Sequence, residues 1–494
     1  MAQSAEQVTA VRQFSCVKFM DKIGRYLAPL LLMAADYIAV VAALSVTLYM
    51  RNTILLYNLP SLVSYQVNHV YIYFIIPLVY LMFFIYDGIY HRRIPFWNIV
   101  EKIFKICAFV TIMAVGLVYF TGQSQHVSRL YVGLSFISCF LFLTLEAYVV
   151  RRMLVVCGLW DKPVIIVGAG KTAELLARSF AEESCIGYKI AGLIEDCCAE
   201  RPLTRQFPLL GNFNNIEETI LASGVDNVIL ATPGLEREQL VSLVYRVQPH
   251  VRSLAIIPNL FGIPLSNMEV ETFLKEKIVL LKVRNNLSSI VNLMVKRSFD
   301  LVVSVLILPF LLLLMSVIAV VIKMDSKGPV FHLAKRLGKN GDEFICYKFR
   351  TMHVNSDMIL EKHLADDSDA SQEWQQFAKL RGYDPRVTAT GKWLRKFSLD
   401  ELPQILNVLK GDMSLVGPRP YLPREKQQMK YYINTILQTL PGITGFWQVS
   451  GRNEIDFDGR LQMDAWYVRN WSVWLDMILL IKTVKVIFSG KGAY

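Results

Sequence analysis

The sequence predicts a membrane protein of mixed α and α/β architecture, built from three parts. Four long apolar runs come first, a strand, glycine turn and helix follow, and a fifth apolar run precedes a basic, turn-rich C-terminal region. With 53% hydrophobic residues, the chain is too apolar for an ordinary soluble protein. We therefore expect a four-helix transmembrane domain at residues 1–155, a cytosolic Rossmann-like domain at 160–285, and an α/β-type domain with a re-entrant membrane helix at 290–494.

The four N-terminal apolar runs are long enough to cross a bilayer, whose hydrocarbon core takes about 20 helical residues. They cover residues 27–50, 71–90, 103–122 and 130–150. Lysine and arginine are concentrated before the first run, between the second and third, and after the fourth. Because such residues stay on the cytoplasmic side, both ends of this bundle are expected there, together with the chain that follows Arg151.

The fifth apolar run, residues 301–322, is flanked at both ends by basic residues, such as Lys296 and Lys323. Pro309 interrupts it, and proline removes a backbone donor and bends a helix. A helix that breaks, dips into the bilayer and returns to the same face satisfies both features. The alternative is a plain fifth span, which would export the C-terminal domain.

The middle domain carries a dinucleotide fingerprint. Gly168-x-Gly170-x-x-Ala173 follows an apolar strand and opens a helix, as in Rossmann-like domains. A second strand at 189–194 ends in Glu195 and Asp196, near the distance expected for a ribose contact. Gly168 and Gly170 are therefore candidate cofactor-binding residues; the alternative is that the two glycines serve only turn and packing geometry.

The net charge of +11 favours anionic partners. In so apolar a chain these are a lipid bilayer and phosphorylated substrates rather than nucleic acid. The eight cysteines form no C-x-x-C pair, which favours reduced packing residues over a metal cluster.

Two adjacent acids, Asp400 and Glu401, stand in the stretch FSLDELPQ. Pro403 fits only the first turn of a helix, and Ser398 with Glu401 matches a capping box. The acid pair is therefore expected at the positive end of a helix. Acids at a helix start often contribute stability alone, so their role depends on the residues around them.

Cationic residues recur in the same domain. Lys348 and Arg350 alternate along the sequence, so they can share one face of a strand. Arg395 precedes the acid pair, and Arg419 lies in a Gly-Pro-Arg-Pro turn, where arginine suits bidentate phosphate contacts. An acid pair among arginines indicates phosphoryl chemistry, in which a carboxylate attacks phosphorus. Mg²⁺ held by one carboxylate and the substrate phosphates would reduce the repulsion.

Three stretches carry a family resemblance: KFRTM from residue 348, SLDELPQILNVLKGDMSLVGPRP from residue 398, and PGITGFWQVSGRN from residue 441. They resemble the bacterial polyprenyl-phosphate hexose-1-phosphate transferases of the monotopic phosphoglycosyl transferase superfamily, over about residues 290–494. The order of the three domains resembles the larger members. That family usually breaks its re-entrant helix at a Ser-Pro about one turn after the position of Pro309; Leu312 and Leu313 stand there in this chain.

The resemblance implies a role for each candidate residue. Asp400 matches the nucleophile and the Mg²⁺ site, and Glu401 matches its partner in the dyad. The implied phosphate-binding and substrate-binding positions are Lys348, Arg350, Arg395 and Arg419. The implied reaction is ping-pong: Asp400 attacks the β-phosphorus of a UDP-hexose, UMP leaves, and undecaprenyl phosphate accepts the sugar phosphate.

The resemblance further implies a bacterial inner-membrane enzyme with its catalytic domain on the cytoplasmic face, which starts O-antigen, capsule or exopolysaccharide synthesis. Galactose is the favoured sugar and glucose the runner-up. A nucleotide-sugar-modifying oxidoreductase is a second hypothesis, disfavoured because no tyrosine has a lysine four residues on. A non-catalytic regulator of polysaccharide assembly is a third. The large N-terminal portion offers surfaces for a homodimer.

Overall fold

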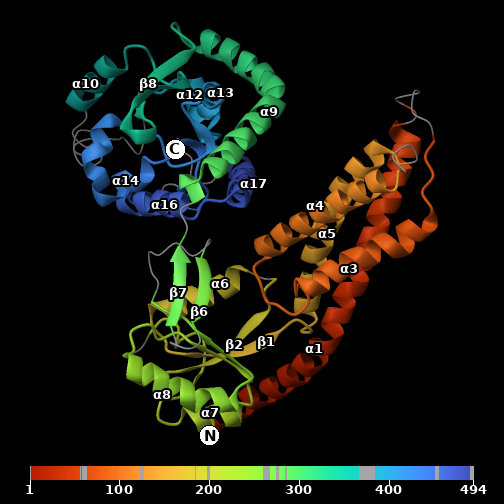
Figure 1. Cartoon of the computed structure of the whole chain (residues 1–494). Coiled ribbons are helices and arrows are strands. Elements are labelled where there is room, and N and C mark those ends of the chain that lie inside the picture. The colour runs from red at the N-terminus through yellow and green to blue at the C-terminus, as the bar shows by residue number, and fades with distance from the viewer. Residues whose placement is uncertain are drawn as a thin grey trace. The chain divides into compact units, whose positions relative to one another are not determined.

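The computed structural model describes residues 2–55, 57, 64–122, 127–183, 185–196, 201–259, 268–273, 278–283, 286–366, 384–450 and 455–489. The chain divides into two compact units, Met1–Leu260 and Phe261–Tyr494 (Figure 1). The apolar helices of the N-terminal part and the parallel sheet that follows them both belong to the first unit.

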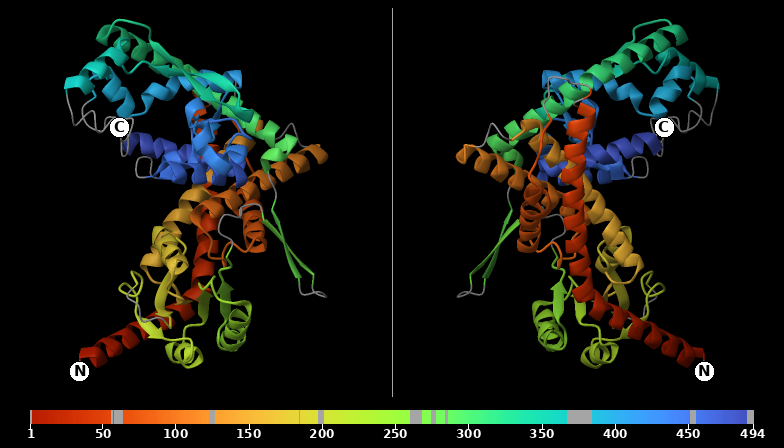
Figure 2. Two further views of the ribbon diagram at one scale, coloured as in Figure 1. Left: turned by 90° about the vertical axis from the view of Figure 1, so that its left-hand side faces the viewer. Right: turned by 90° about the vertical axis from the view of Figure 1, so that its right-hand side faces the viewer.

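The first unit begins with a bundle of four apolar helical segments that share one hydrophobic core. They are α1 (Ala2–Tyr49), which the π-helical turn η1 (Met50–Leu55) extends; η2 (Tyr71–Ile75) continued by α3 (Ile76–Tyr86); α4 (Phe96–Phe120); and α5 (Arg129–Val156). Of these, α1, α4 and α5 are long and apolar enough to cross a membrane. The N-terminal part of α1 projects away from the bundle (Figure 2).

The second predicted span, residues 71–90, is shorter than the sequence suggests. Its helix ends at Tyr86, because Asp87 and Gly88 form a turn in which Gly88 takes a φ of +69°. The Asp87 carboxylate also pairs with Lys102 on α4 at 2.7 Å. A helix over Tyr71–Tyr86 extends only about 24 Å at a rise of about 1.5 Å per residue, less than the apolar core of about 30 Å.

A five-stranded parallel sheet completes the first unit, with the order β3-β2-β1-β4-β5. The strands are β1 (Lys162–Val167), β2 (Tyr188–Ile194), β3 (Leu209–Gly211), β4 (Asn227–Leu230) and β5 (Ser253–Ile256). The helices are α6 (Lys171–Glu182), α7 (Ile216–Ser223), α8 (Arg237–Val247) and the short η4 (Gln248–His250). The predicted strand before Gly168 and the predicted strand at 189–194 are thus confirmed, and this strand order occurs in doubly wound dinucleotide-binding sheets.

Alternation along β1 builds a core on each face of the sheet. Ile165 and Val167 pack with α7 and α8, whereas Ile166 packs with Ala173 of α6. Figure 1 shows α6 on one side of the sheet and α7 with α8 on the other.

The two fingerprint glycines have a structural explanation. Gly168 has a φ of +98°, and a Cβ there would lie 2.6 Å from the Thr232 methyl group. Gly170 is the residue just before α6. Glu195, expected at a ribose, instead accepts a hydrogen bond of 2.7 Å from the Ala169 amide and one from Arg201. The turn is therefore closed by a side chain of the protein itself.

The second unit is mostly helical. It opens with the antiparallel pair β6 (Met268–Phe273) and β7 (Ile278–Val283) and with η5 (Asn286–Ser288). Next come α9 (Ile290–Asp325), the antiparallel hairpin of β8 (Phe331–Leu337), η6 (Lys339–Gly341) and β9 (Glu343–Phe349), then α10 (Ser356–Asp366) and α12 (Ala389–Lys396). β6 and β7 pair only with each other, so the parallel sheet ends at β5.

The remaining elements of this unit pack around α9 and the hairpin. They are η7 (Leu399–Gln404), α13 (Ile405–Lys410), β10 (Ser414–Val416), η8 (Pro423–Tyr432), α14 (Ile433–Ile436), β11 (Gly442–Thr444), α15 (Phe446–Ser450), α16 (Phe457–Arg469) and α17 (Val473–Ser489). β10 and β11 form a short parallel pair.

Among the described residues of this unit, α9 is the helix that is long and apolar enough to cross a membrane, and it has two different faces. Its exposed positions from Val302 to Leu314 are all apolar, as Leu306 and Phe310 illustrate. Pro309 lies within the helix, and Figure 1 shows α9 bent along its length, as expected of an internal proline. An apolar surface of this extent needs a lipid environment or a partner.

The buried face of α9 is fastened near its beginning by a buried ion pair. Lys296 donates to the Asp476 carboxylate at 2.7 Å and to the Val416 carbonyl at 3.0 Å. Asp476 also accepts hydrogen bonds from Tyr467 and Trp471. Lys296 and Asp476 are 5% and 0% exposed, so each charge relies on these fixed partners instead of water.

The far end of α9 is fastened to the same unit. Arg350 donates to the carbonyl oxygens of Ser326 and Lys327, each at 2.7 Å. Asp325, the last helical residue, accepts a hydrogen bond from the Thr390 amide at 3.2 Å. Both ends of the apolar helix are therefore bound to one globular body.

The Lys296–Asp476 pair predicts a specific stability effect. Lys296→Met leaves a buried carboxylate without its cation, so the free energy of unfolding should fall by about 3–5 kcal/mol. Replacing both partners, as Lys296→Met with Asp476→Leu, should cost less than the single change. Thermal unfolding of the purified protein in detergent measures both. Lys323→Met, at an exposed position of α9, is the control and should change the stability little. If Lys296→Met changed the stability as little as Lys323→Met, the buried ion pair would not have the stabilising role assigned to it.

Candidate active site

Asp400 and Glu401 lie in the 3₁₀ helix η7, which leads directly into α13. The capping box predicted from Ser398 and Glu401 does not form. Ser398 adopts left-handed backbone angles, φ 55° and ψ 25°, and its side chain makes no capping hydrogen bond. The physical reason is the tight turn between α12 and η7, in which the Ser398 amide donates to the Arg395 carbonyl oxygen at 3.2 Å. A left-handed non-glycine residue costs about 1–2 kcal/mol and often marks a functional site.

Glu401 is held by Lys348 of β9. The Lys348 Nζ donates to the Glu401 Oε1 at 2.7 Å. Buried Asn407 on α13 fixes this arrangement, because it accepts a hydrogen bond from the Tyr347 amide and donates to the Ile345 carbonyl. Nothing in the sequence singles out Asn407, since its partners on β9 lie far away along the chain.

Asp400 lines a cavity of about 430 Å³, a size typical of small-molecule sites. Its lining is mostly contributed by the β8–β9 hairpin and the segment after it. The lining residues are Pro329, Phe331, His332, Ala334, Arg336, Lys348, Phe349, Arg350, Thr351, Met352, His353, Val354, Ser356, Arg395 and Asp400. Among these described residues Asp400 is the one acid, facing four arginine or lysine side chains.

Burial and the neighbouring Glu401 carboxylate raise the pKa of Asp400 to about 6, against the opposing pull of Lys348 and Arg395. Burial alone would lower the pKa of Lys348, but the two carboxylates raise it. Lys348 therefore stays charged, and Asp400 is ionised at neutral pH while remaining a more basic carboxylate than usual.

Arg395 reaches the cavity from the last turn of α12. Its Nε donates to the Thr351 hydroxyl at 3.1 Å. Gly391, one turn earlier, allows this approach, because a Cβ there would lie 2.1 Å from the Thr351 carbonyl oxygen. Burial lowers the pKa of Arg395, and Asp400 opposes that shift, so the two side chains interact electrostatically.

The other two predicted arginines have different surroundings. Arg350 borders the cavity, but it follows the end of β9, is 6% exposed, and holds the end of α9. Arg419 is not among the cavity-lining residues; its side chain lies 3.8 Å from Glu425 and packs near the Trp447 ring. Its backbone amide donates to buried Asp464 at 3.0 Å, which fixes the Gly-Pro-Arg-Pro turn.

Two further cavity residues were missed by sequence reasoning. His332 and Arg336 alternate with Ala334 on one face of β8, and His332 pairs across the hairpin with Lys348. The Nε and Nη1 atoms of Arg336 are buried and have no hydrogen-bond partner among the described residues. Burial lowers the pKa of His332, and Lys348 lowers it further. The alternation in FHLAKRL was the available signal for this face.

The carboxylates present suit a cation that arrives with a substrate. Among the described residues, no group of three or more histidine, cysteine or acidic side chains could hold a metal by itself. Mg²⁺, however, is commonly bound by one or two carboxylates together with substrate phosphates. Asp400 could supply one such oxygen, whereas Glu401 is engaged by Lys348.

Comparison with protein families gives two matches along the chain. The family described as bacterial sugar transferase matches residues 291–490. The family described as CoA-binding domain matches residues 86–258, which include α4, α5 and the parallel sheet.

Three curated proteins illustrate the similarity over nearly the whole chain. The undecaprenyl-phosphate galactose phosphotransferase of Salmonella typhimurium is 35% identical over 82% of this chain and 84% of its own length. The UDP-galactose-lipid carrier transferase of Erwinia amylovora is 34% identical, with the same coverage. The UDP-glucose:undecaprenyl-phosphate glucose-1-phosphate transferase of Escherichia coli is 30% identical over 68% of this chain and 70% of its own length.

The raised pKa of Asp400 predicts a pH-dependent stability difference. The folded-state pKa is about 6, whereas an unfolded aspartate titrates near about 3.9. The folded protein then binds this proton more tightly, so wild-type stability falls as pH rises from about 4 through 6. Asp400→Asn should be more stable than wild type at pH 7.5, by up to about 3 kcal/mol for a shift of about two pKa units, and should match it near pH 4. Unfolding midpoints across this range measure the difference, and a constant difference would contradict the assignment.

Proposed function

This chain belongs to the polyprenyl-phosphate hexose-1-phosphate transferases and is a sugar-phosphate transferase. On that basis, we propose that it transfers galactose-1-phosphate from UDP-galactose to undecaprenyl phosphate. The products are UMP and undecaprenyl-diphospho-galactose. The observation that carries the proposal is the placement of Asp400 as the acid in a cavity otherwise rich in cations. That arrangement suits a negatively charged diphosphate and a carboxylate that must approach it.

The proposed reaction has two displacements. First, a carboxylate oxygen of Asp400 bonds to the β-phosphorus of UDP-galactose, the bond from that phosphorus to the bridging oxygen breaks, and UMP leaves. A phosphate oxygen of undecaprenyl phosphate then bonds to the same phosphorus and displaces the Asp400 carboxylate. One phosphoanhydride replaces another, so the exchange needs no external energy source. A covalent intermediate splits a difficult transfer into two easier steps.

The cavity residues support each displacement electrostatically. Arg395 and Arg336 can hold phosphate oxygens, since arginine binds phosphate with paired donors. Lys348 forms an ion pair with Glu401 at 2.7 Å, and of the two acids Asp400 is the one that lines the cavity. Donors fixed before the reaction stabilise developing charge without reorganising.

We assign Mg²⁺ to Asp400 and the substrate diphosphate. When bound there, the cation would neutralise phosphate charge and so reduce its repulsion of the carboxylate. The protein residues that remain, Arg395 and Lys348, balance the charge of the acid pair.

Helix α9 is proposed to be re-entrant, with the catalytic unit on the cytoplasmic face of the inner membrane. A helix that crossed the bilayer would carry its ends to opposite sides. Here Lys296 near one end and Asp325 at the other both hydrogen-bond the same unit, which favours a dip and return. Pro309 lies within α9, and the helix is bent, which is compatible with such a dip. A site held at headgroup level can meet the phosphate of a lipid carrier.

Galactose is the proposed sugar because the two relatives with the broadest coverage above carry galactose in their names. Glucose is the alternative, after the name of the Escherichia coli relative. The rate of UMP release from UDP-galactose against UDP-glucose distinguishes the two sugars. We further propose that the parallel-sheet domain is Rossmann-like and that the chain forms a homodimer. An oxidoreductase role is not favoured, because Glu195 already occupies the glycine turn.

Asp400→Asn should abolish transfer, with a loss of about a thousandfold or more, because an amide cannot form the acyl-phosphate. UMP release from UDP-galactose with undecaprenyl phosphate and Mg²⁺ is the measurement. Asp357→Asn, an exposed aspartate of the same unit, serves as the control and should keep full activity. Wild-type release by Asp400→Asn would refute the nucleophile.

Re-entry makes a topological prediction. In a cysteine-free background, single cysteines at Leu313 and Asp458 should both resist an impermeant thiol reagent added to intact cells, because neither reaches the outer face. Asn68→Cys, between the first two helical segments, should react and so validates the assay. Labelling at Asp458 from outside would instead indicate a fifth span.

A further inference from the structure

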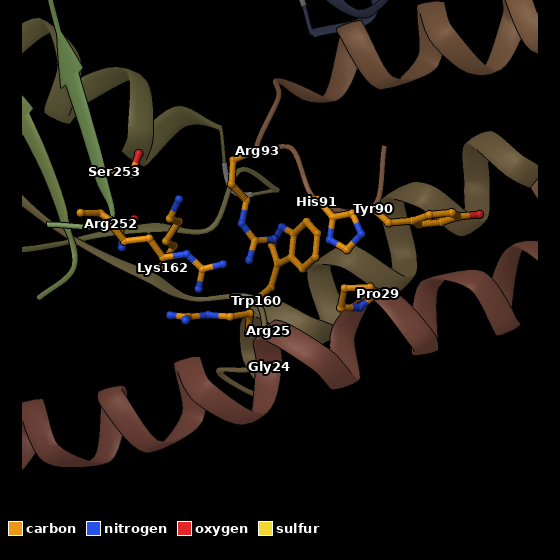
Figure 3. Close-up of a pocket in the computed structure, with 11 residues that line it drawn as sticks. Gly24, Arg25, Pro29, Tyr90, His91, Arg93, Trp160, Lys162, Arg252 and Ser253 are labelled. Atoms are coloured by element: carbon orange, nitrogen blue, oxygen red, sulfur yellow. The ribbon is translucent and has the colours of Figure 1, made fainter. Parts of the chain in front are cut away.

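A second cationic cavity lies in the first unit, away from the residues assigned to catalysis. It has a volume of about 230 Å³ and is lined by eleven residues (Figure 3). They come from α1, the loop between α3 and α4, the turn before β1, and the beginnings of β1, β4 and β5. The cavity thus lies at the amino-terminal edge of the parallel sheet, opposite to the end that carries Gly168.

Four of the lining side chains are cationic: Arg25, Arg93, Lys162 and Arg252. Figure 3 shows that they approach the cavity from separate elements of the fold. None of the described residues that line it is acidic. The Asp226 carboxylate lies nearby, 3.7 Å from Arg25, but its side chain is 53% exposed, so solvent weakens the pair. A lining with four cations and no acid favours an anionic ligand.

The cavity is built on a rigid frame. The Arg93 guanidinium lies over the Trp160 ring, 3.3 Å from its centroid, and Trp160 is 2% exposed and donates to the Cys185 carbonyl. Gly24 packs so closely that a Cβ would lie 2.1 Å from the Leu159 carbonyl oxygen. These contacts fix α1 against the start of the sheet domain, so the cations are positioned before any ligand arrives.

The volume of the cavity and its position at the ends of the candidate membrane helices limit the kinds of ligand that it could bind. A volume of about 230 Å³ is below the range of about 300–1,000 Å³ for whole drug-sized ligands, which favours a single phosphate group over a complete dinucleotide. The lining residues also lie at the ends of membrane helices: α1 becomes a candidate span at Ile23, and α4 begins at Phe96. Phosphate headgroups of lipids occur at this level.

We propose that this cavity is a phosphate-binding site, distinct from the catalytic cavity, that ties the membrane bundle and the sheet domain together. The phosphate belongs either to the headgroup of an acidic phospholipid or to a small soluble phosphate compound. Either source offers the oxygens that arginine and lysine bind. Bound phosphate would link cations on α1, the α3–α4 loop and two strands.

The experiment uses the full chain and separates the two sources. For the lipid source, protein from mixed phosphatidylglycerol and phosphatidylcholine nanodiscs is released into detergent, and retained phosphatidylglycerol is measured by native mass spectrometry. For the soluble source, radiolabelled inorganic phosphate is dialysed against protein in phosphatidylcholine nanodiscs. We expect the wild-type protein to bind either phosphatidylglycerol or inorganic phosphate. The double variant Arg25→Gln with Arg252→Gln should lower that binding about tenfold or more, since hydrogen bonds to charged groups are strong.

A charge-matched control distinguishes a site from general attraction. Arg178→Gln with Arg237→Gln removes two exposed arginines from α6 and α8 of the same domain and should leave binding unchanged. Arg252→Gln alone, at an exposed position, keeps the test valid if the double cavity variant fails to fold. Any phosphate bound in the catalytic cavity near Asp400 should contribute equally to every variant, so it does not affect the comparison between variants. No binding in either arm, or equal loss in cavity and control variants, overturns the proposal.

Discussion

The buried ion pair between Lys296 of the apolar helix α9 and Asp476 is the interaction on which the arrangement of the second unit depends. Helix α9 exposes a continuous apolar face, while its other face carries Lys296 into contact with Asp476 and the Val416 carbonyl. A charge removed from water is tolerated only where its partners are fixed. The pair therefore sets the position of α9 relative to β10, α16 and α17.

The same helix also supports the reacting carboxylates. Arg297, next to Lys296, donates to the carbonyl oxygens of Val408 and Leu409 at the end of α13. Helix α13 continues η7, which carries Asp400 and Glu401. One surface of α9 is thus apolar and exposed, and another holds the segment that carries the two carboxylates. Under the proposed function, this coupling would let a soluble sugar nucleotide and a lipid phosphate react at one site.

Much of the fold could be predicted from local sequence patterns, because the spacing of apolar residues and the positions of glycine and proline indicate helices, strands and turns. The apolar runs, the strands of the parallel sheet and the cluster of Lys348, Arg395 and Asp400 could all be predicted. The capping box at Ser398 does not form because the backbone there is set by the tight turn between α12 and η7. Arg350, which follows β9, donates to the end of α9, whereas Arg336 reaches the cavity from β8. Both placements depend on tertiary contacts that the local motif does not report.

The proposed reaction requires Asp400 to carry the sugar phosphate covalently between the two displacements. Intact-protein mass spectrometry of wild type incubated with UDP-galactose, in the absence of lipid acceptor, tests this requirement directly. We expect an added hexose phosphate on the peptide that contains Asp400, and we expect it to disappear when undecaprenyl phosphate is supplied. Formation of the lipid product at full rate with no such adduct at any time would refute the covalent role of Asp400.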